Sequence, residues 1–189
     1  MHIKSLLSIG NEKESFRKLA EFLKNPLKFF KENKDTEERL LDFMTLMVRL
    51  SATISILVDL ILAQKPPIVL VIAFSITILL AKIIAQIGLF ISSHILNFFV
   101  SIIAEKDNLL AAKRIIAYSS SVSLIYPIPI IGFSALFLTI IIHTIGISKQ
   151  YKLPYFKSFL ITALPLIIVG IFAYFLRGIE GLKLFFYQD

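Results

Sequence analysis

The longest uninterrupted apolar stretch of the chain runs from Pro67 to Ala104 and holds a single charged residue, Lys82. At about 1.5 Å of rise per residue, a helix of this length exceeds the roughly 30 Å hydrocarbon core of a bilayer. With about 100° of rotation per residue, its polar side chains share one narrow sector, called the polar stripe from here on: Ser75, Lys82, Gln86, Ser93 and Asn97. A lipid-facing helix with such a stripe needs neighbours to cover it, so we expect this helix at the centre of a helical bundle.

Four further apolar stretches accompany this helix. They predict spans at 41–63, 109–126, 130–147 and 159–176, beside the span at 67–104. A proline pair follows the first span, Gly146 is expected to cap the fourth, and Pro165 predicts a kink in the fifth. The fold class expected is therefore all-α: a polytopic helical membrane protein with five transmembrane helices at 41–177 and a short interfacial tail at 178–189.

Residues 1–40 have a different pattern, in which charged residues alternate with an apolar face at helical spacing. Asn11 is expected to cap a helix that ends at Lys24, and Pro26 to begin a second short helix. Asp35, with Glu38 three residues later, resembles a capping box that opens the next helix. The apolar face and its flanking lysines form a candidate docking surface: Phe16, Leu19, Phe22, Leu23, Lys24, Lys28, Phe29 and Phe30.

Two interpretations of this N-terminal cytosolic amphipathic segment remain open. In the first, its phenylalanines and lysines dock on anionic lipid or on a cytosolic protein partner. In the second, the phenylalanines pack against the underside of the protein's own bundle. Both place the segment at the membrane surface.

Composition agrees with a membrane protein. Hydrophobic residues make up 57% of the 189 residues and the mean hydropathy is +0.81, beyond the range of soluble domains. The chain has no cysteine, which excludes disulfides and thiolate chemistry. The net charge of +7 is typical of a positive-inside bias with anionic headgroup contact, and we expect no nucleic-acid partner.

The distribution of lysine and arginine predicts the orientation. Residues 1–40 are called the leader from here on. With five spans and a cytosolic N-terminus, the inner side carries this basic leader, the loop region 106–114 and the loop region 149–157. The outer side carries Lys65, Arg177 and Lys183. This asymmetry favours a multi-pass protein whose N-terminus is cytosolic and whose C-terminus lies on the opposite side.

Candidate chemistry is sparse. Arg49 and Asp59 lie near the ends of the first span, where they snorkel or line a polar path. Ser119 and Ser123 permit close helix approach, and we expect them to meet the polar stripe. No hydrolase, metalloprotease or paired-aspartate motif falls within the spans, so we expect no catalytic residue, no metal, no cofactor and no enzymatic activity.

Several short motifs together resemble the Yip1-domain family of small membrane proteins. They lie in order between Lys24 and Leu176: Asn25–Phe30, Ala117–Ser120, Pro127–Gly132, Ile145–Lys149 and Leu164–Ile168. The resemblance implies a five-span helical fold and, in eukaryotic relatives, a role in vesicle trafficking with small GTPases.

The function expected is that of a non-enzymatic membrane scaffold or adaptor linked to membrane organisation or trafficking. The alternative is a small transporter, channel or lipid-handling protein that uses the polar stripe together with the third-span serines. The bilayer is the first expected partner, and a second copy of the chain is a further candidate partner.

Overall fold

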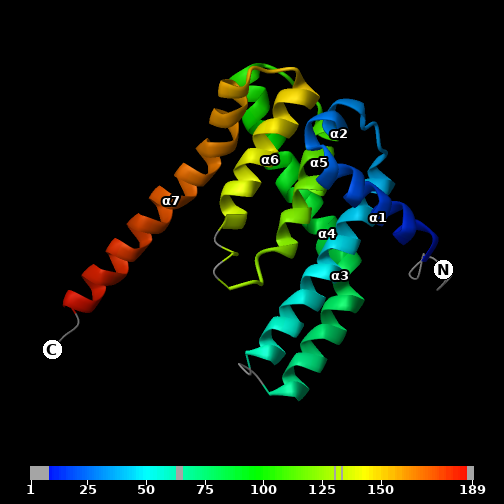
Figure 1. Cartoon of the computed structure of the whole chain (residues 1–189). Helices are drawn as coiled ribbons and strands as arrows, with labels where there is room; N and C mark the ends of the chain where they lie inside the picture. The colour runs from blue at the N-terminus through cyan, green and yellow to red at the C-terminus, as the bar shows by residue number, and fades with distance from the viewer. Residues whose placement is uncertain (1–8, 63–65, 130, 133, 187–189) are drawn as a thin grey trace.

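The computed structural model describes residues 9–62, 66–129, 131–132 and 134–186, and every regular element in them is helical. In Figure 1, α1 and α2 lie beside one end of α3 and α4, which run side by side away from them, and α7 extends away from the other helices on the left. The elements are α1 (Ile9–Lys24), α2 (Pro26–Glu32), α3 (Glu37–Ile61), α4 (Pro67–Ala104), α5 (Leu109–Ser119), the 3-10 helix η2 (Ser120–Leu124), α6 (Ser134–Tyr151) and α7 (Tyr155–Phe186).

The second leader helix forms as its sequence predicts, and the first ends at Lys24 as expected. The cap expected at Asn11 is wrong, because α1 begins before it, at Ile9. The Asn25 side chain accepts a hydrogen bond from the Lys28 backbone N–H at 3.0 Å, and Pro26 opens α2. The capping box expected at Asp35 and Glu38 is wrong, because α3 is capped at Thr36 without a side-chain hydrogen bond. The Asp35 carboxylate is buried and instead contacts the side chains of Lys18, Tyr118 and Asn33.

Helices α3 and α4 form a long antiparallel hairpin (Figure 1). The face of α4 that is buried follows a four-residue spacing through Ala81, Ala85 and Leu89 to Ser93. Gly88 lies against α3, where an added Cβ would be 3.1 Å from the methyl group of Met44. Small residues thus let the two helices approach closely.

Within the described residues, α3 and α4 are the two helices long and apolar enough to cross a membrane, where the sequence predicted five spans. Only 17% of the most apolar window of each is buried. The core helix of a soluble protein is mostly buried, so these two helices differ from one in exposing their apolar surface.

The third predicted span is not a separate membrane helix of adequate length. Helix α5 has 11 residues and then tightens into the 3-10 turn η2. Most of its side chains are covered by other helices, including those of Ala111, Ile115 and Tyr118. In this tightened turn, serine hydroxyls donate hydrogen bonds to main-chain carbonyls of the preceding turn; Ser121, for example, donates to the Tyr118 carbonyl. Helix α5 is therefore the central core helix.

The fourth predicted span, 130–147, also differs from the helix that the structure has there. Helix α6 begins at Ser134 and runs through Gly146, which is not a cap, to Tyr151. Because Gly146 has no side chain, Ile115 and Phe30 pack directly on it; an added Cβ would lie 3.0 and 3.2 Å from them. Helix α7 (Tyr155–Phe186) contains the range 159–176 predicted for the fifth span. Its apolar stretch within the described residues is Tyr155–Ile168, and the rest of the predicted span lies partly outside them.

The elements that precede α7 form two regions. The head comprises α1, α2 and α5 with the adjoining ends of α3, α4 and α6. Hydrogen bonds connect its turns: Lys106 donates to the Tyr151 carbonyl, and the Tyr151 hydroxyl donates to the Asn108 carbonyl. The rest of α3 and α4 is called the hairpin and extends away from the head (Figure 1).

Candidate functional site

The head is organised around the buried carboxylate of Asp35, which is 8% exposed. The Lys18 ammonium of α1 pairs with Oδ1, and the Tyr118 hydroxyl of α5 donates to Oδ2. Asn33 Nδ2 donates to the same Oδ2 at 2.9 Å, and its Oδ1 accepts the Asp35 backbone N–H at 3.0 Å. One carboxylate thus joins α1, the α2–α3 connection and α5.

The ionisation of Asp35 follows from these contacts. Burial raises the pKa of the carboxyl group, because a charge is less stable away from water. The hydrogen bonds from Lys18, Tyr118 and Asn33, with the positive charge of Lys18, outweigh burial and bring the pKa below its ordinary value of 3.8. Asp35 is therefore ionised at neutral pH.

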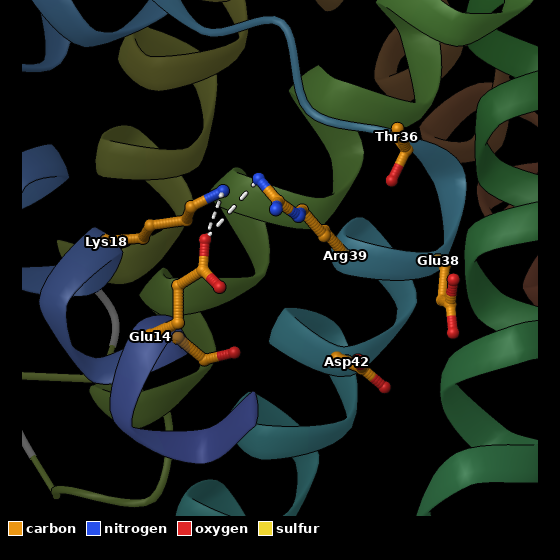
Figure 2. Close-up of a pocket in the computed structure, with 7 residues that line it drawn as sticks. Glu14, Lys18, Thr36, Glu38, Arg39 and Asp42 are labelled. Carbon is orange, nitrogen blue, oxygen red and sulfur yellow. Dashed lines mark ion pairs between the residues drawn. The ribbon is translucent and has the colours of Figure 1, made fainter. Parts of the chain in front are cut away.

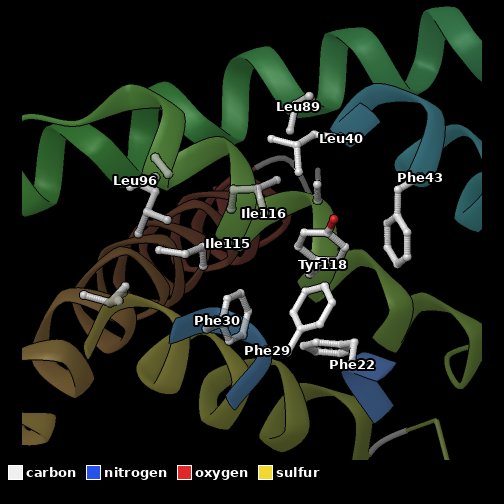
Figure 3. Packing of buried hydrophobic residues seen from close by; sticks show 14 of the residues in the cluster. Phe22, Phe29, Phe30, Leu40, Phe43, Leu89, Leu96, Ile115, Ile116 and Tyr118 are labelled. Atoms are coloured by element: carbon white, nitrogen blue, oxygen red, sulfur yellow. The ribbon is translucent and has the colours of Figure 1, made fainter. Parts of the chain in front are cut away.

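An aromatic cluster packs around Tyr118, one of the residues that bind the Asp35 carboxylate (Figure 3). The Tyr118 ring lies 4.5 Å from Phe29 and 4.6 Å from Phe43, measured between ring centroids, and Phe22 and Phe30 meet edge to face at 5.6 Å. These rings come from α1, α2, α3 and α5, so the leader is part of the core. For Phe22, Phe29 and Phe30 the structure agrees with the second interpretation of the leader, because these side chains pack against the protein itself.

A row of ion pairs fixes α1 along α3. Arg49 donates to Glu12 at 2.8 Å, while Glu14 lies 3.7 Å from the Lys18 ammonium and 3.5 Å from Arg39 (Figure 2). The polar cavity beside them has a volume of about 240 Å³ and is lined by Glu14, Ser15, Lys18, Thr36, Glu38, Arg39 and Asp42. The ion pair of Arg49 with Glu12 thus attaches α1 of the leader to α3.

The polar stripe is divided by the fold. Ser93 is buried and Asn97 is half-buried, with Nδ2 donating to Asp107 at 2.7 Å. Ser75 and Gln86 are exposed, so the cover expected for the stripe is missing over its N-terminal half. The buried face of α4 lies to one side of the stripe because small apolar residues give the closer packing. Lys82 is half-buried.

The remaining polar candidates lie apart from the stripe. Ser119 is buried and bonds to the Ile115 carbonyl of its own helix. The Ser123 carbonyl accepts a hydrogen bond from Ser51 of α3, so η2 packs mainly on α3 and not on the polar stripe. Asp59 is half-buried near the far end of the hairpin. The structure does not bring these residues into one site.

The candidate docking surface is also divided. Phe22, Phe29 and Phe30 are buried and Leu19 is half-buried, whereas the others form the outer surface of the leader: Phe16, Leu23, Lys24 and Lys28. Lys24 and Lys28 line an open hollow of about 560 Å³ between α1 and α2, with Glu21, Asn25, Phe29 and Glu32. Leu27, 45% exposed, extends this outer surface.

Sequence reasoning also missed a crevice between α3, α4 and α5. Its volume is about 420 Å³, and Glu37, Leu41, Gln86, Ile87, Leu89, Phe90, Ile91 and Lys113 line it. The Lys113 ammonium is 2.7 Å from the Glu37 carboxylate at its polar end. No sequence signal links these residues, because Glu37 and Lys113 meet only when α5 packs beside α3.

These features define an all-α protein with a polar helical head, a docked amphipathic leader and a long apolar hairpin. Within the described residues, no group of three or more His, Asp or Glu side chains is placed to hold a metal ion. No family model matches the chain, and neither a curated protein nor a solved structure matches it.

Proposed function

We propose that this protein is an integral membrane scaffold, anchored by the hairpin of α3 and α4, which presents the outer surface of its leader to a partner on the cytosolic side. The observation that carries the proposal is the exposure of large apolar side chains on α4, including Leu79 at 78% and Ile68 at 66%. Water contact with so extended an apolar surface is unfavourable, whereas lipid contact is not.

The charged leader supports this division of the molecule. Helix α1 brings Glu12 and Glu14 alongside α3 at Arg49 and Arg39. Charges of this kind are costly inside hydrocarbon, so this part of the molecule lies in water or among headgroups. Helix α5 contacts the same region through Tyr118 and Asp35 and therefore belongs to the head.

The five-span arrangement, with a cytosolic N-terminus and the C-terminus opposite, is the competing topology. The two arrangements place Tyr126, an exposed residue after η2, on different sides of the membrane. In the hairpin arrangement Tyr126 is on the same side as Asp107; with five spans it is on the opposite side.

Single cysteines distinguish these topologies, since the natural chain has none and each label is unique. We expect an impermeant maleimide to label Asp107→Cys and Tyr126→Cys from the same side of sealed vesicles. Labelling of Tyr126→Cys from the opposite side, with Asp107→Cys unchanged, establishes five spans and rejects the hairpin arrangement.

The scaffold role is supported by how the polar groups are used. Asp35, Arg49 and Ser123 hold helices together, and they provide no connected polar path along the described part of the hairpin. The resemblance to the Yip1-domain family suggests membrane organisation or trafficking as the setting. A transporter needs a polar route across the bilayer, which these residues do not line.

A photo-crosslinking amino acid on the leader tests the scaffold role. We expect a protein adduct in the native membrane when Leu23, which is 64% exposed, carries the photoreactive group. The adjacent Phe22 is 0% exposed and gives the matched control, from which we expect only intramolecular products. Absence of a protein adduct at Leu23 contradicts the scaffold proposal.

Lipid handling is the second candidate, favoured by the crevice at Gln86 and Lys113. If it operates, Gln86→Ala and Lys82→Ala abolish lipid or solute movement in proteoliposomes without loss of folding. Unchanged movement in both variants rejects this candidate.

A further inference from the structure

The crevice between α3, α4 and α5 combines two chemistries. One end holds the Glu37–Lys113 ion pair, and the wall beside it is formed by Ile87, Phe90 and Ile91. These three apolar side chains are 54%, 59% and 51% exposed, so the crevice opens on the outer surface of α4. We propose that it binds the headgroup and upper acyl chain of one phosphatidylethanolamine molecule, an inference that rests on the membrane anchoring proposed above.

The position of the crevice suits a lipid headgroup. Glu37 is the first residue of α3, and Lys113 lies in the core helix of the head. Ile87 and Phe90 continue into the apolar surface of α4. The crevice thus lies where the head meets the hairpin, with its polar end on the head and its apolar wall continuous with the hairpin.

Among the residues that the structure describes, Lys113 has donor capacity beyond its one ion pair. The side chain is 11% exposed, and an ammonium group carries three N–H donors. Within the described part of the chain, Glu37 Oε1 is the acceptor found for it, at 2.7 Å. A lipid phosphate beside Lys113 supplies acceptors for the remaining donors and forms charge-assisted hydrogen bonds.

The charges favour a zwitterionic lipid over an anionic one. Lys113 is complementary to the phosphate, and the 64% exposed Glu37 is complementary to a headgroup cation. An anionic headgroup without a cation leaves Glu37 facing a like charge, which disfavours its binding.

Ethanolamine fits the cation position better than choline. Its primary ammonium donates hydrogen bonds to the Glu37 carboxylate and the Gln86 side-chain oxygen, whereas a quaternary ammonium has no N–H donor. Choline recognition relies on aromatic cages, and Phe90 is the single aromatic residue lining this crevice.

Lipid binding by the full-length protein in detergent tests the assignment, using phosphatidylethanolamine, phosphatidylcholine and phosphatidylglycerol with the same acyl chains. We expect phosphatidylethanolamine to bind up to about fivefold more tightly than either of the others, the range for one partly exposed charge interaction. Equal binding of the three lipids, or a preference for phosphatidylglycerol, overturns the proposal.

Glu37→Gln is the decisive variant, since Glu37 is exposed and its replacement leaves the core intact. We expect it to lose the preference for phosphatidylethanolamine over phosphatidylglycerol. Glu38→Gln is the matched control, because Glu38 lines the separate polar cavity beside α1 and should retain the preference. Retention of the preference in Glu37→Gln, or equal loss in both variants, overturns the assignment.

Alkaline extraction of membranes separates this inference from the anchoring on which it rests. A protein that stays in the membrane at high pH but shows no lipid preference contradicts the lipid site alone. A protein released by alkali contradicts the anchoring and, with it, the lipid site.

Discussion

Asp35 illustrates how single residues hold the head together. Its carboxylate is buried, yet it remains charged because donors from Lys18, Tyr118 and Asn33 converge on it. Removing a donor leaves a buried charge with fewer partners, and the free energy of that loss exceeds the net value of an ordinary hydrogen bond.

Tyr118→Phe tests this at the smallest scale. The substitution keeps the buried ring but removes the hydroxyl that donates to Asp35. We expect the free energy of unfolding in detergent to fall by about 1–3 kcal/mol. Tyr155→Phe, at an exposed residue whose ring the substitution keeps, should change it by less than about 0.5 kcal/mol. Equal stability of the two variants contradicts the role assigned to Asp35.

Acid should loosen the head through the same residue. Because the folded-state pKa of Asp35 lies below its ordinary value of 3.8, the unfolded state binds the proton more readily. The stabilisation is fully present above about pH 4 and is lost as the pH falls through the depressed folded value. Asp35→Asn should lower the melting temperature at neutral pH and reduce its fall in acid; an unchanged acid profile would contradict this account.

At the scale of elements, two helix contacts differ in whether they can accommodate a side chain in place of a glycine. Gly146 of α6 faces Ile115 and Phe30 of the packed head, whereas Gly88 of α4 faces only the flexible methyl end of Met44. A Cβ is accommodated where a side-chain end can move away, and it strains the structure where several buried atoms must shift together.

Alanine at each glycine tests this difference. Both substitutions gain up to about 1 kcal/mol of helix propensity, but only Gly146→Ala adds crowding against the head. We expect Gly88→Ala to be at least as stable as the natural protein and Gly146→Ala to be less stable than Gly88→Ala by about 1 kcal/mol. Thermal unfolding of the two variants in one detergent measures the difference, and the reverse order would refute the packing argument.

At the scale of the whole molecule, exposed apolar residues occupy two environments. Leu79 of α4 is 78% exposed and Leu23 of α1 is 64% exposed, so burial inside the protein does not distinguish them. Their surroundings do: α1 is a charged amphipathic helix, whereas α4 is apolar over most of its length. The anchoring proposal therefore places Leu79 in lipid and Leu23 at the aqueous surface.

Arginine at these two positions distinguishes the environments. Leu79→Arg places a charge in hydrocarbon, which costs about 2.5–3.5 kcal/mol near the centre of a membrane helix, and should reduce the inserted fraction. Leu23→Arg should leave insertion unchanged. The membrane-bound fraction after alkaline extraction measures both, and equal insertion of the two variants would count against a lipid-facing hairpin.

The sequence by itself determined the all-α class, the helical range of α4, the break at Asn25 and Pro26, and the amphipathic character of the leader. These are local properties, set by helical periodicity, proline and capping chemistry. The sequence reasoning could not distinguish a membrane span from a core helix at 109–126, because both are apolar.

Only the tertiary structure decided where the long-range partners lie. In the structure, Phe22 and Phe30 are buried in the head, and Asp35 accepts a hydrogen bond from Tyr118 instead of capping a helix. Glu37 forms an ion pair with Lys113 beside the crevice. Gln86 of the polar stripe is left exposed. The physical reason is that these outcomes depend on which helix faces pack most closely, and that packing joins residues far apart in the chain.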